Sequence, residues 1–290
     1  MLKGSFTALI TPFKNGKIDE ESFRSFIDFQ IDEGIHGVVP VGTTGESPTL
    51  SHEEHKQAVE ICIDQANKRV PVIAGTGSNN TEEAIDLTRH AEKSGADAAL
   101  IVTPYYNKPT QRGMYEHYKS ISTNSNIPII IYNIPGRSVV NMTNETMKEL
   151  FKLKNIVGVK DATADIPRVY SSRIDIGEDF NLLTGDDATC LAFMLYGGHG
   201  TISVTANIAP KLCSDFMNFC LDGKFKEAAK INDLLMPLHE ALFVESSPGP
   251  VKYAANKLGL CSSEIRLPLT EISDETKKTV EQALKHASLI

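Results

Sequence analysis

Short apolar runs alternate with longer stretches of helical periodicity along most of this chain. Eight of the runs are rich in β-branched residues, are bounded by turn residues and predict strands. Runs of this kind, apolar throughout, are typical of parallel strands that are buried on both faces. The predicted strands cover residues 5–11, 37–42, 71–75, 98–103, 128–132, 155–162, 181–185 and 200–204.

The stretches between the first six strands have the apolar spacing of amphipathic helices. Ser51 followed by Glu54 forms a capping-box pattern, which marks the start of one helix. Strands that alternate with helices form parallel βαβ units. Eight such units without a break in composition predict an α/β protein, a (β/α)8 TIM barrel, in preference to an open doubly wound sheet. The helices are predicted over residues 19–33, 51–68, 81–94, 112–123 and 144–153.

Only helical periodicity remains after the last predicted strand. We therefore predict two parts, a barrel of residues 1–222 with a catalytic mouth and a C-terminal helical appendage of residues 223–290. In (β/α)8 barrels the chemistry occurs at the carboxyl ends of the strands, so candidate residues are sought there. The late helices are predicted over residues 212–221, 225–243, 250–258 and 274–287.

Composition limits the classes of protein that this chain can represent. A net charge of −8 disfavours binding to nucleic acid or to anionic membranes. The first residues carry too short an apolar run for a signal peptide, and no later run is long enough to span a bilayer, so we expect a cytoplasmic protein. The five cysteines contain no CxxC pair, which favours reduced structural thiols over a disulfide framework or a zinc site.

One lysine lies at the carboxyl end of the apolar run 155–162. Lys160 would be partly desolvated there, and burial makes an ammonium group less favourable relative to the free amine. A free amine can attack a carbonyl carbon and form an imine. The alternative is an ordinary solvated or salt-bridged lysine just beyond a strand, and a lone lysine does not decide between the two.

Other polar residues follow the neighbouring predicted strands. The turn 42–45, Gly-Thr-Thr-Gly, offers hydroxyls and backbone N–H groups that suit a carboxylate, although an ordinary turn explains it as well. The Tyr132 hydroxyl can relay protons, or it can belong to a core tyrosine. Arg137 can bind a carboxylate through two N–H groups, or it can be a solvated loop residue. His52 and His55 lie three residues apart, but the spacing suggests no third ligand, so we predict no metal site.

Six motifs occur together in one order along the chain. In this combination the chain closely resembles the dihydrodipicolinate synthase family, a group of pyruvate-dependent class I aldolases, over nearly its whole length. The motifs are GTTGE (42–46), VTPYYN (102–107), YNIPGR (132–137), GVKDA (158–162), LTGDD (183–187) and GGHGTISVTAN (197–207).

The resemblance implies a reaction and the residues that carry it. Lys160 would form an imine with pyruvate and, after loss of a methyl proton, an enamine, with no metal or organic cofactor. Tyr132 would be the proton donor and acceptor, next to Thr43. Tyr106 would complete this relay from a neighbouring subunit, which requires a homo-oligomer, and a dimer of tight dimers is expected.

The resemblance also implies how the substrates bind. Thr44, Ile202 and Gly185 match positions that hold pyruvate, and Arg137 matches the arginine that receives the carboxylate of L-aspartate 4-semialdehyde. The product would be 4-hydroxy-tetrahydrodipicolinate, in the first committed step of diaminopimelate and lysine biosynthesis. The segment 246–250 departs from the pattern, because some members carry an asparagine there.

Two alternatives to this interpretation stay open. The same chemistry serves aldolases that act on sugar-derived 2-oxo acids, but the related N-acetylneuraminate lyases usually lack the arginine at the position of Arg137. A catalytically silent barrel is the other alternative, and it would have no need of a nucleophile and a proton relay together. The resemblance further implies feedback inhibition by L-lysine at a separate interface site. That site maps onto Ser47, Pro48, His52, His55, Asn79, Glu83 and Tyr105.

Overall fold

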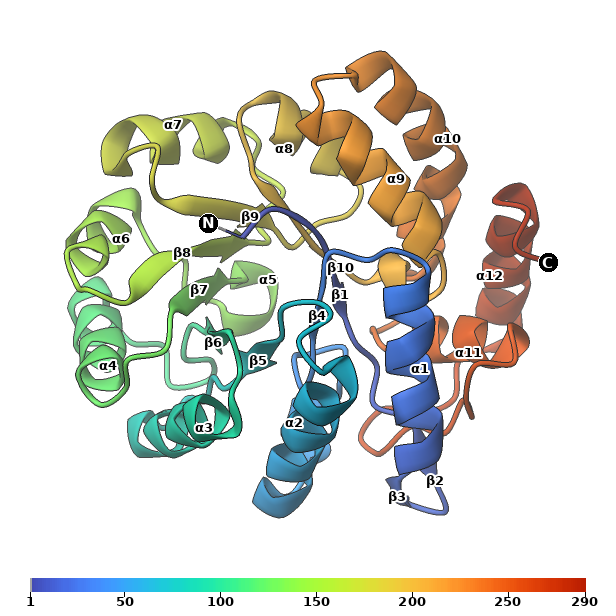
Figure 1. The fold of residues 1–290 in the computed structure, drawn as a ribbon, viewed down its shortest axis with the longest axis horizontal. Coiled ribbons are helices and arrows are strands. Elements are labelled where there is room, and N and C mark those ends of the chain that lie inside the picture. The colour runs from blue at the N-terminus through green and yellow to red at the C-terminus, as the bar shows by residue number, and fades with distance from the viewer. Residues whose placement is uncertain (1) are drawn as a thin grey trace. The chain divides into compact units, whose positions relative to one another are not determined.

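The computed structural model describes residues 2–290 and contains every strand and helix that the sequence predicts. Eight parallel strands alternate with helices, and further helices follow the last strand, so the (β/α)8 barrel class is confirmed (Figure 1). Most strands are shorter than predicted, mainly because the last residues of the apolar runs already turn toward the next loop; β5 instead begins two residues later than predicted, and β7 ends one residue later. The strands are β1 (Gly4–Ala8), β4 (Gly37–Val39), β5 (Ile73–Gly75), β6 (Ala98–Val102), β7 (Ile129–Asn133), β8 (Ile156–Asp161), β9 (Asn181–Thr184) and β10 (Gly200–Ser203).

The helices agree with the predicted ranges to within two residues at each end, the usual scatter of helix termini. Ser51 and Glu54 form the expected capping box at the start of α2. The helices predicted from the sequence are α1 (Glu20–Asp32), α2 (His52–Ala66), α3 (Thr81–Ser94), α4 (Gln111–Thr123), α6 (Asn144–Phe151), α9 (Pro210–Leu221), α10 (Phe225–Ala241), α11 (Gly249–Lys257) and α12 (Asp274–His286).

Several short elements were not predicted. The helix α7 (Pro167–Ile176) exposes Tyr170 and Ile174, so its apolar residues do not follow one buried stripe. The remaining elements are too short to show a helical or strand period. They are the hairpin β2 (Phe13–Lys14) with β3 (Lys17–Ile18), the helices α5 (Pro135–Ser138) and α8 (Cys190–Leu195), and the 3₁₀ turns η1 (Ser47–Thr49) and η2 (Thr205–Asn207).

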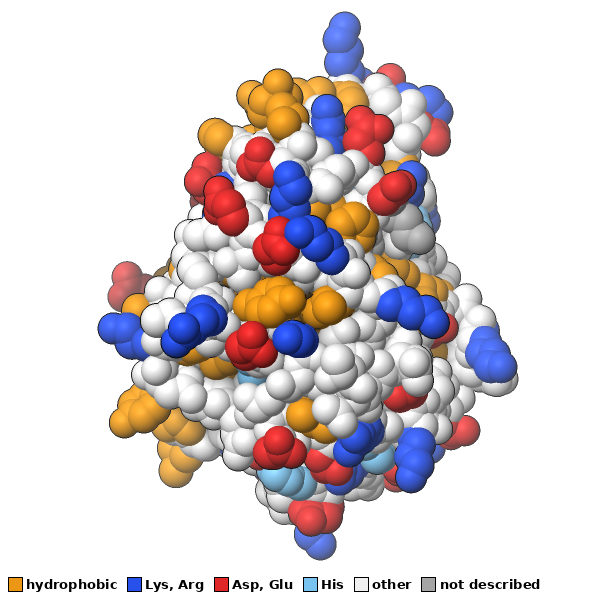
Figure 2. Space-filling model, turned by 90° about the vertical axis from the view of Figure 1, so that its left-hand side faces the viewer, with side chains coloured by type: hydrophobic (Ala, Val, Ile, Leu, Met, Phe, Trp, Pro, Cys, Tyr) orange, Lys and Arg blue, Asp and Glu red, His pale blue; other side chains and the backbone are white. Residues whose placement is uncertain are grey.

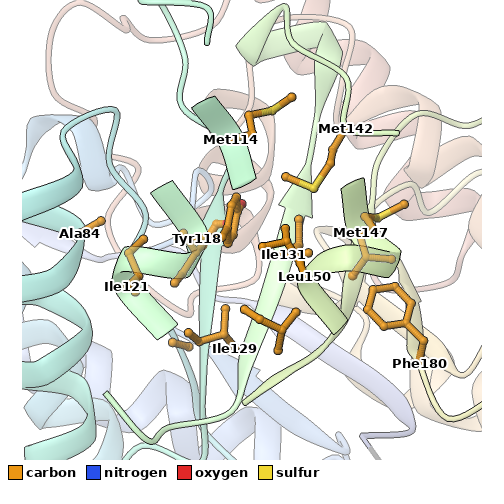
Figure 3. Packing of buried hydrophobic residues seen from close by; sticks show 14 of the residues in the cluster. Ala84, Met114, Tyr118, Ile121, Ile129, Ile131, Met142, Met147, Leu150 and Phe180 are labelled. Atoms are coloured by element: carbon orange, nitrogen blue, oxygen red, sulfur yellow. The ribbon is translucent and has the colours of Figure 1, made fainter. Parts of the chain in front are cut away.

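Packing divides the chain into two compact units, and the first comprises Ile73–Ile202 with residues 2–3. Its strands pair in parallel in chain order from β5 to β10. Figure 3 shows the apolar side chains of this unit, among them Tyr118, Ile131 and Phe180, packed between the strands and helices α4 and α6. Burial of such large side chains is worth about 1.5–3 kcal/mol each, so this cluster keeps the strand ends in place.

The second unit comprises Gly4–Val72 and Ser203–Ile290. In it β1 pairs in parallel with β4, α1 packs on α2, and α10 packs on α9 and α12. This division groups the first strands with the C-terminal helices. The division at residue 222 that the sequence suggests therefore describes a different boundary, and it stays a prediction.

The distribution of charged side chains, the polarity of the helices and the burial of the cysteines are consistent with what the composition predicts. On the face that Figure 2 shows, acidic and basic side chains are interspersed, and no continuous basic area is present there. Within residues 2–290, no helix is long and apolar enough to cross a membrane. All five cysteines are buried.

A buried histidine on α4 couples the stability of the first unit to pH. The His117 ring contacts the Thr81 hydroxyl through Nδ1 at 3.0 Å and packs edge-on against Tyr118. Burial lowers the pKa of His117 from 6.5 to about 4. The unfolded chain therefore takes up this proton first as the pH falls. The stabilising contribution of the neutral ring is complete above about pH 6.5 and is lost between pH 6.5 and about 4.

We expect His117→Gln to remove much of this acid sensitivity. The difference between 6.5 and about 4 corresponds to about 3 kcal/mol of unfolding free energy, which the wild type should lose on acidification and the variant should not. Denaturant unfolding measured between pH 7.5 and 4.5 checks this. His286→Gln, at an exposed position on α12, is the control and should follow the wild type. Parallel curves for wild type and His117→Gln would contradict the assignment.

Candidate active site

Lys160 lies on β8 and is buried, with 5% of its surface exposed. The parallel register of β7 and β8 places it opposite Tyr132, which is also buried. The Lys160 Nζ atom lies 4.2 Å from the centre of the Tyr132 ring. The face of an aromatic ring attracts a cation. The Tyr132 hydroxyl places a second ionisable group beside the Lys160 amine. The structure thus brings together the nucleophile and the proton-relay residue that the sequence proposed.

Gly185, directly after β9, leaves the space that the Lys160 side chain occupies. A Cβ atom at this position would lie 2.6 Å from Lys160 Cε and 2.9 Å from Ala162 Cβ. The Gly185 N–H donates to the Asp161 carbonyl at 2.7 Å, so the backbone is held close to β8. Only glycine, which has no Cβ atom, can lie this close to β8 without a clash with the Lys160 side chain. The structure therefore assigns Gly185 a clear physical task beside the lysine.

A polar network behind the lysine was not recognised from the sequence. Asp161, the next residue on β8, accepts from Arg168 Nε at 3.1 Å, from the Thr163 N–H at 2.9 Å and from Asn133 Nδ2 at 3.3 Å. Asn133 follows Tyr132 on β7 and is fully buried. These bonds tie together the residues that directly follow Tyr132 and Lys160. Both residues stand inside motifs that the sequence showed, but nothing local in the sequence indicates that they bond to each other.

Arg137 lies on the one-turn helix α5, after β7. Its neighbour Ser138 is buried and donates to the Ile134 carbonyl at 2.9 Å, and it accepts from the Thr103 hydroxyl at 3.1 Å. Val139 closes the turn at φ 67°, a conformation that a β-branched residue rarely adopts. The anchored turn leaves the Arg137 side chain exposed. An exposed guanidinium on a rigid support is suited to bind a carboxylate from solution.

Two other predicted residues of the first unit differ in exposure. Ile202 on β10 is buried, with 1% exposed. Tyr106 has 89% of its surface exposed and adopts φ 68°. A large aromatic side chain held so far out of its own chain is typical of a contact with another molecule.

Part of the predicted effector site also lies in the first unit. Asn79 Nδ2 donates to the Tyr105 carbonyl at 3.2 Å, and Ser78 donates to the Glu83 carboxylate. Burial and, next, the Glu83 carboxylate raise the pKa of Tyr105. Asn79, Glu83 and Tyr105 are therefore close neighbours.

The second unit holds the two threonines and the rest of the effector residues. Thr44 is buried, and Thr43 precedes it in the turn between β4 and η1. Ser47 and Pro48 lie on η1. His52 and His55 lie in the first turns of α2, where His52 is exposed and His55 is buried. In the part of the chain that the structure describes, no cluster of three metal-ligating side chains occurs.

The fold and the buried lysine define a (β/α)8 enzyme with a lysine at the carboxyl end of a barrel strand. The chain belongs to the dihydrodipicolinate synthetase family, whose model matches residues 1–287, and it is a lyase of that family. It is 60% identical to a 4-hydroxy-tetrahydrodipicolinate synthase of Afipia carboxidovorans, over 99% of this chain and 97% of that protein.

Solved structures agree with this assignment. A dihydrodipicolinate synthase of Acinetobacter baumannii, complexed with pyruvate, is 46% identical and superposes with a TM-score of 0.98 over 100% of both chains. The enzyme of Cyanidioschyzon merolae with lysine bound is 36% identical, with a TM-score of 0.96 over 100% of this chain and 99% of that one.

We expect Gly185→Ala to destabilise the protein through contact of the new methyl group with the Lys160 stem. Overpacking of this kind costs about 1–3 kcal/mol. In a Lys160→Ala background the loss should be smaller, because one of the two close contacts disappears. A double-mutant cycle by denaturant unfolding measures this coupling. Gly136→Ala, where a Cβ meets nothing within 4 Å, is the control. Equal effects of Gly185→Ala in both backgrounds would contradict the contact.

Proposed function

We propose that this protein condenses pyruvate with L-aspartate 4-semialdehyde through an imine on Lys160. The product is 4-hydroxy-tetrahydrodipicolinate, in the first committed step of diaminopimelate and lysine biosynthesis. The observation that carries the proposal is the buried Lys160 amine at 4.2 Å from the Tyr132 ring in a member of this family. The pyruvate complex of the Acinetobacter relative supports the first substrate. A cytoplasmic location stays a prediction from the sequence.

The reaction begins with attack of the neutral Lys160 amine on the carbonyl carbon of pyruvate. Loss of water gives a protonated imine, which withdraws electrons and lets a methyl proton leave. The enamine carbon then attacks the aldehyde carbon of the second substrate, and the new alkoxide takes up a proton. Cyclisation through the second substrate's amino group expels Lys160 and regenerates the amine. No step of this sequence calls for a metal or an organic cofactor.

Proton transfers in this scheme are assigned to the Tyr132 hydroxyl. Tyr132 passes protons between the carbonyl oxygen, the imine and the new alkoxide, with Thr43 as its relay partner. Tyr106 of the partner subunit completes the relay. The 89% exposure of Tyr106 supports this assignment, because the side chain extends away from its own chain. The proposal thus includes a homo-oligomer, a dimer of tight dimers.

The substrates are assigned to separate groups. Thr44, Gly185 and Ile202 hold pyruvate, and the exposed Arg137 guanidinium binds the carboxylate of the aldehyde substrate. Arg137 also favours this reaction over an aldolase of sugar-derived 2-oxo acids. The anchoring of its turn through Ser138 supports a role in selecting the second substrate.

We expect borohydride to trap pyruvate as a three-carbon adduct on Lys160. Reduction converts the imine into a stable secondary amine, which peptide mass mapping locates. Lys160→Ala should remain folded, form no adduct and lose nearly all activity.

Arg137→Ala is the matched control for this experiment. It should still be trapped by pyruvate and borohydride, but its condensation rate at low aldehyde should fall by about 10²-fold, the loss of one charge-assisted carboxylate contact. An adduct on another lysine would exclude Lys160 as the nucleophile. Equal losses of trapping and condensation in Arg137→Ala would exclude the separate role of the arginine.

We further propose that L-lysine inhibits the enzyme at Ser47, Pro48, His52, His55, Asn79, Glu83 and Tyr105. The lysine complex of the Cyanidioschyzon relative supports such an effector. The neighbouring Asn79, Glu83 and Tyr105 provide a carboxylate for the α-ammonium group and amide and hydroxyl groups for the carboxylate. In the proposal the histidines of α2 contact the ε-ammonium end.

Glu83→Ala should abolish inhibition by millimolar lysine with little change in the uninhibited rate, because in the proposal Glu83 binds the effector and neither substrate. Inhibition curves at several pyruvate concentrations check this, and wild-type inhibition should be partial or cooperative. Glu82→Ala removes an exposed carboxylate one residue away and should remain sensitive. Inhibition that is purely competitive with pyruvate would contradict a separate site.

A further inference from the structure

A buried ion pair holds the residue that follows the Gly-Thr-Thr-Gly turn. Glu46 has 3% of its surface exposed and Lys252, on α11, has none. Lys252 Nζ donates to Glu46 Oε1 at 2.6 Å, and the Arg266 backbone N–H donates to Glu46 Oε2 at 3.1 Å. Both carboxylate oxygens of Glu46 are therefore bound by the C-terminal part of the second unit.

The same lysine also holds the other side of the turn. Lys252 Nζ donates to the Thr11 carbonyl at 2.9 Å, and the Thr11 hydroxyl donates to the Gly45 carbonyl at 2.7 Å. Because Gly45 precedes Glu46 in the chain, these bonds close a ring through Lys252, Glu46, Gly45 and Thr11. Gly45, a member of this ring, directly follows Thr44 in the chain.

The turn inside this ring is conformationally demanding. Val41 and Glu46, at its two ends, have φ angles of 52° and 57°, which cost L-residues free energy and need support from their surroundings. A Cβ at Gly45 would lie 3.0 Å from Val41 Cα and 3.1 Å from the Leu9 carbonyl. The Glu46 side chain is the anchor that keeps its own backbone in this conformation.

Stability alone is a poor reason for such a pair. Two charges that leave water pay a desolvation penalty, and apolar replacements of buried ion pairs are often neutral or stabilising. Burial lowers the pKa of Lys252, and the Glu46 carboxylate opposes that shift. Lys252 and Arg266 also both lie 4.2 Å from the Phe13 ring centre. Apolar packing does not fix the orientation of a side chain as closely as hydrogen bonds do. The hydrogen bonds of the pair hold Glu46 and Lys252 in one geometry.

We propose that Glu46 and Lys252 are positioning residues that hold the Thr43–Thr44 turn in its substrate-binding conformation. Through them, helix α11 and the segment at Arg266 determine how well the enzyme takes up pyruvate. The inference rests on the proposed function, in which Thr44 holds pyruvate and Thr43 relays protons. It gives the C-terminal helices a role in the reaction although Lys252 itself contacts no substrate.

Three variants separate positioning from stability, namely Lys252→Met, Glu46→Gln and the two combined. Each single variant buries an unpaired charge, and we expect its Tm to fall by about 10 °C. The double variant buries no charge, and its Tm should return most of the way to that of the wild type. Its KM for pyruvate, and the pyruvate concentration needed for half-maximal trapping on Lys160, should nevertheless stay raised by about tenfold or more. Lys257 also lies on α11, and Lys257→Met, which breaks a partly exposed pair with Glu281 of α12, should change neither quantity.

Thr11→Val provides a test that leaves the ion pair intact. It removes only the hydroxyl that holds the Gly45 carbonyl, and it should raise the same KM severalfold. A double variant with recovered Tm and wild-type KM would overturn the inference, as would a folded Thr11→Val with unchanged KM. If wild-type Lys160 is trapped normally in those experiments, the proposed function survives. No trapping in the wild type would overturn both.

Discussion

Lys160 keeps its place beside Tyr132 because β7 and β8, after an irregularity between Ile129 and Ile130, keep one parallel register to their carboxyl ends. A shift of one residue would turn every side chain of a strand to its opposite face, and the amine would then point away from the ring. The pairing of Tyr132 with Lys160 and of Asn133 with Asp161 shows the register at the strand ends. The bonds from Asp161 to Asn133 and Arg168 hold that register where the apolar strand stops.

The two most buried lysines of the chain illustrate how surroundings determine what an amine does. Lys160 and Lys252 both lie 4.2 Å from an aromatic ring centre. Lys252 has a carboxylate at 2.6 Å and a carbonyl at 2.9 Å, which hold it as a charged structural group. Within residues 2–290, no carboxylate forms a salt bridge with Lys160. A lysine that is buried without a counter-ion is the one suited to act as a nucleophile.

Much of the site follows from local sequence. The apolar runs predicted the strands, and their last residues identified Lys160, Tyr132 and the Gly-Thr-Thr-Gly turn, because parallel strands bring their carboxyl ends to one side. The residues had also singled out Arg137 as a possible carboxylate-binding side chain, and the resemblance to a known family added its substrate and the effector site. Gly185 was included through its motif, and the structure supplies the reason, which is the path of the Lys160 stem.

The sequence by itself determined the class of fold and the order of strands and helices, because these depend on periodicity and on residues next to one another in the chain, and it proposed Lys160 as the nucleophile. The tertiary structure alone revealed the Asp161 network and the pairing of Glu46 with Lys252, whose partners lie 206 residues apart. It also revealed the short helix α5, which carries Arg137, and the exposed face of α7. Such features depend on distances between side chains that are remote in sequence, or on segments too short to have a period, and neither leaves a local pattern.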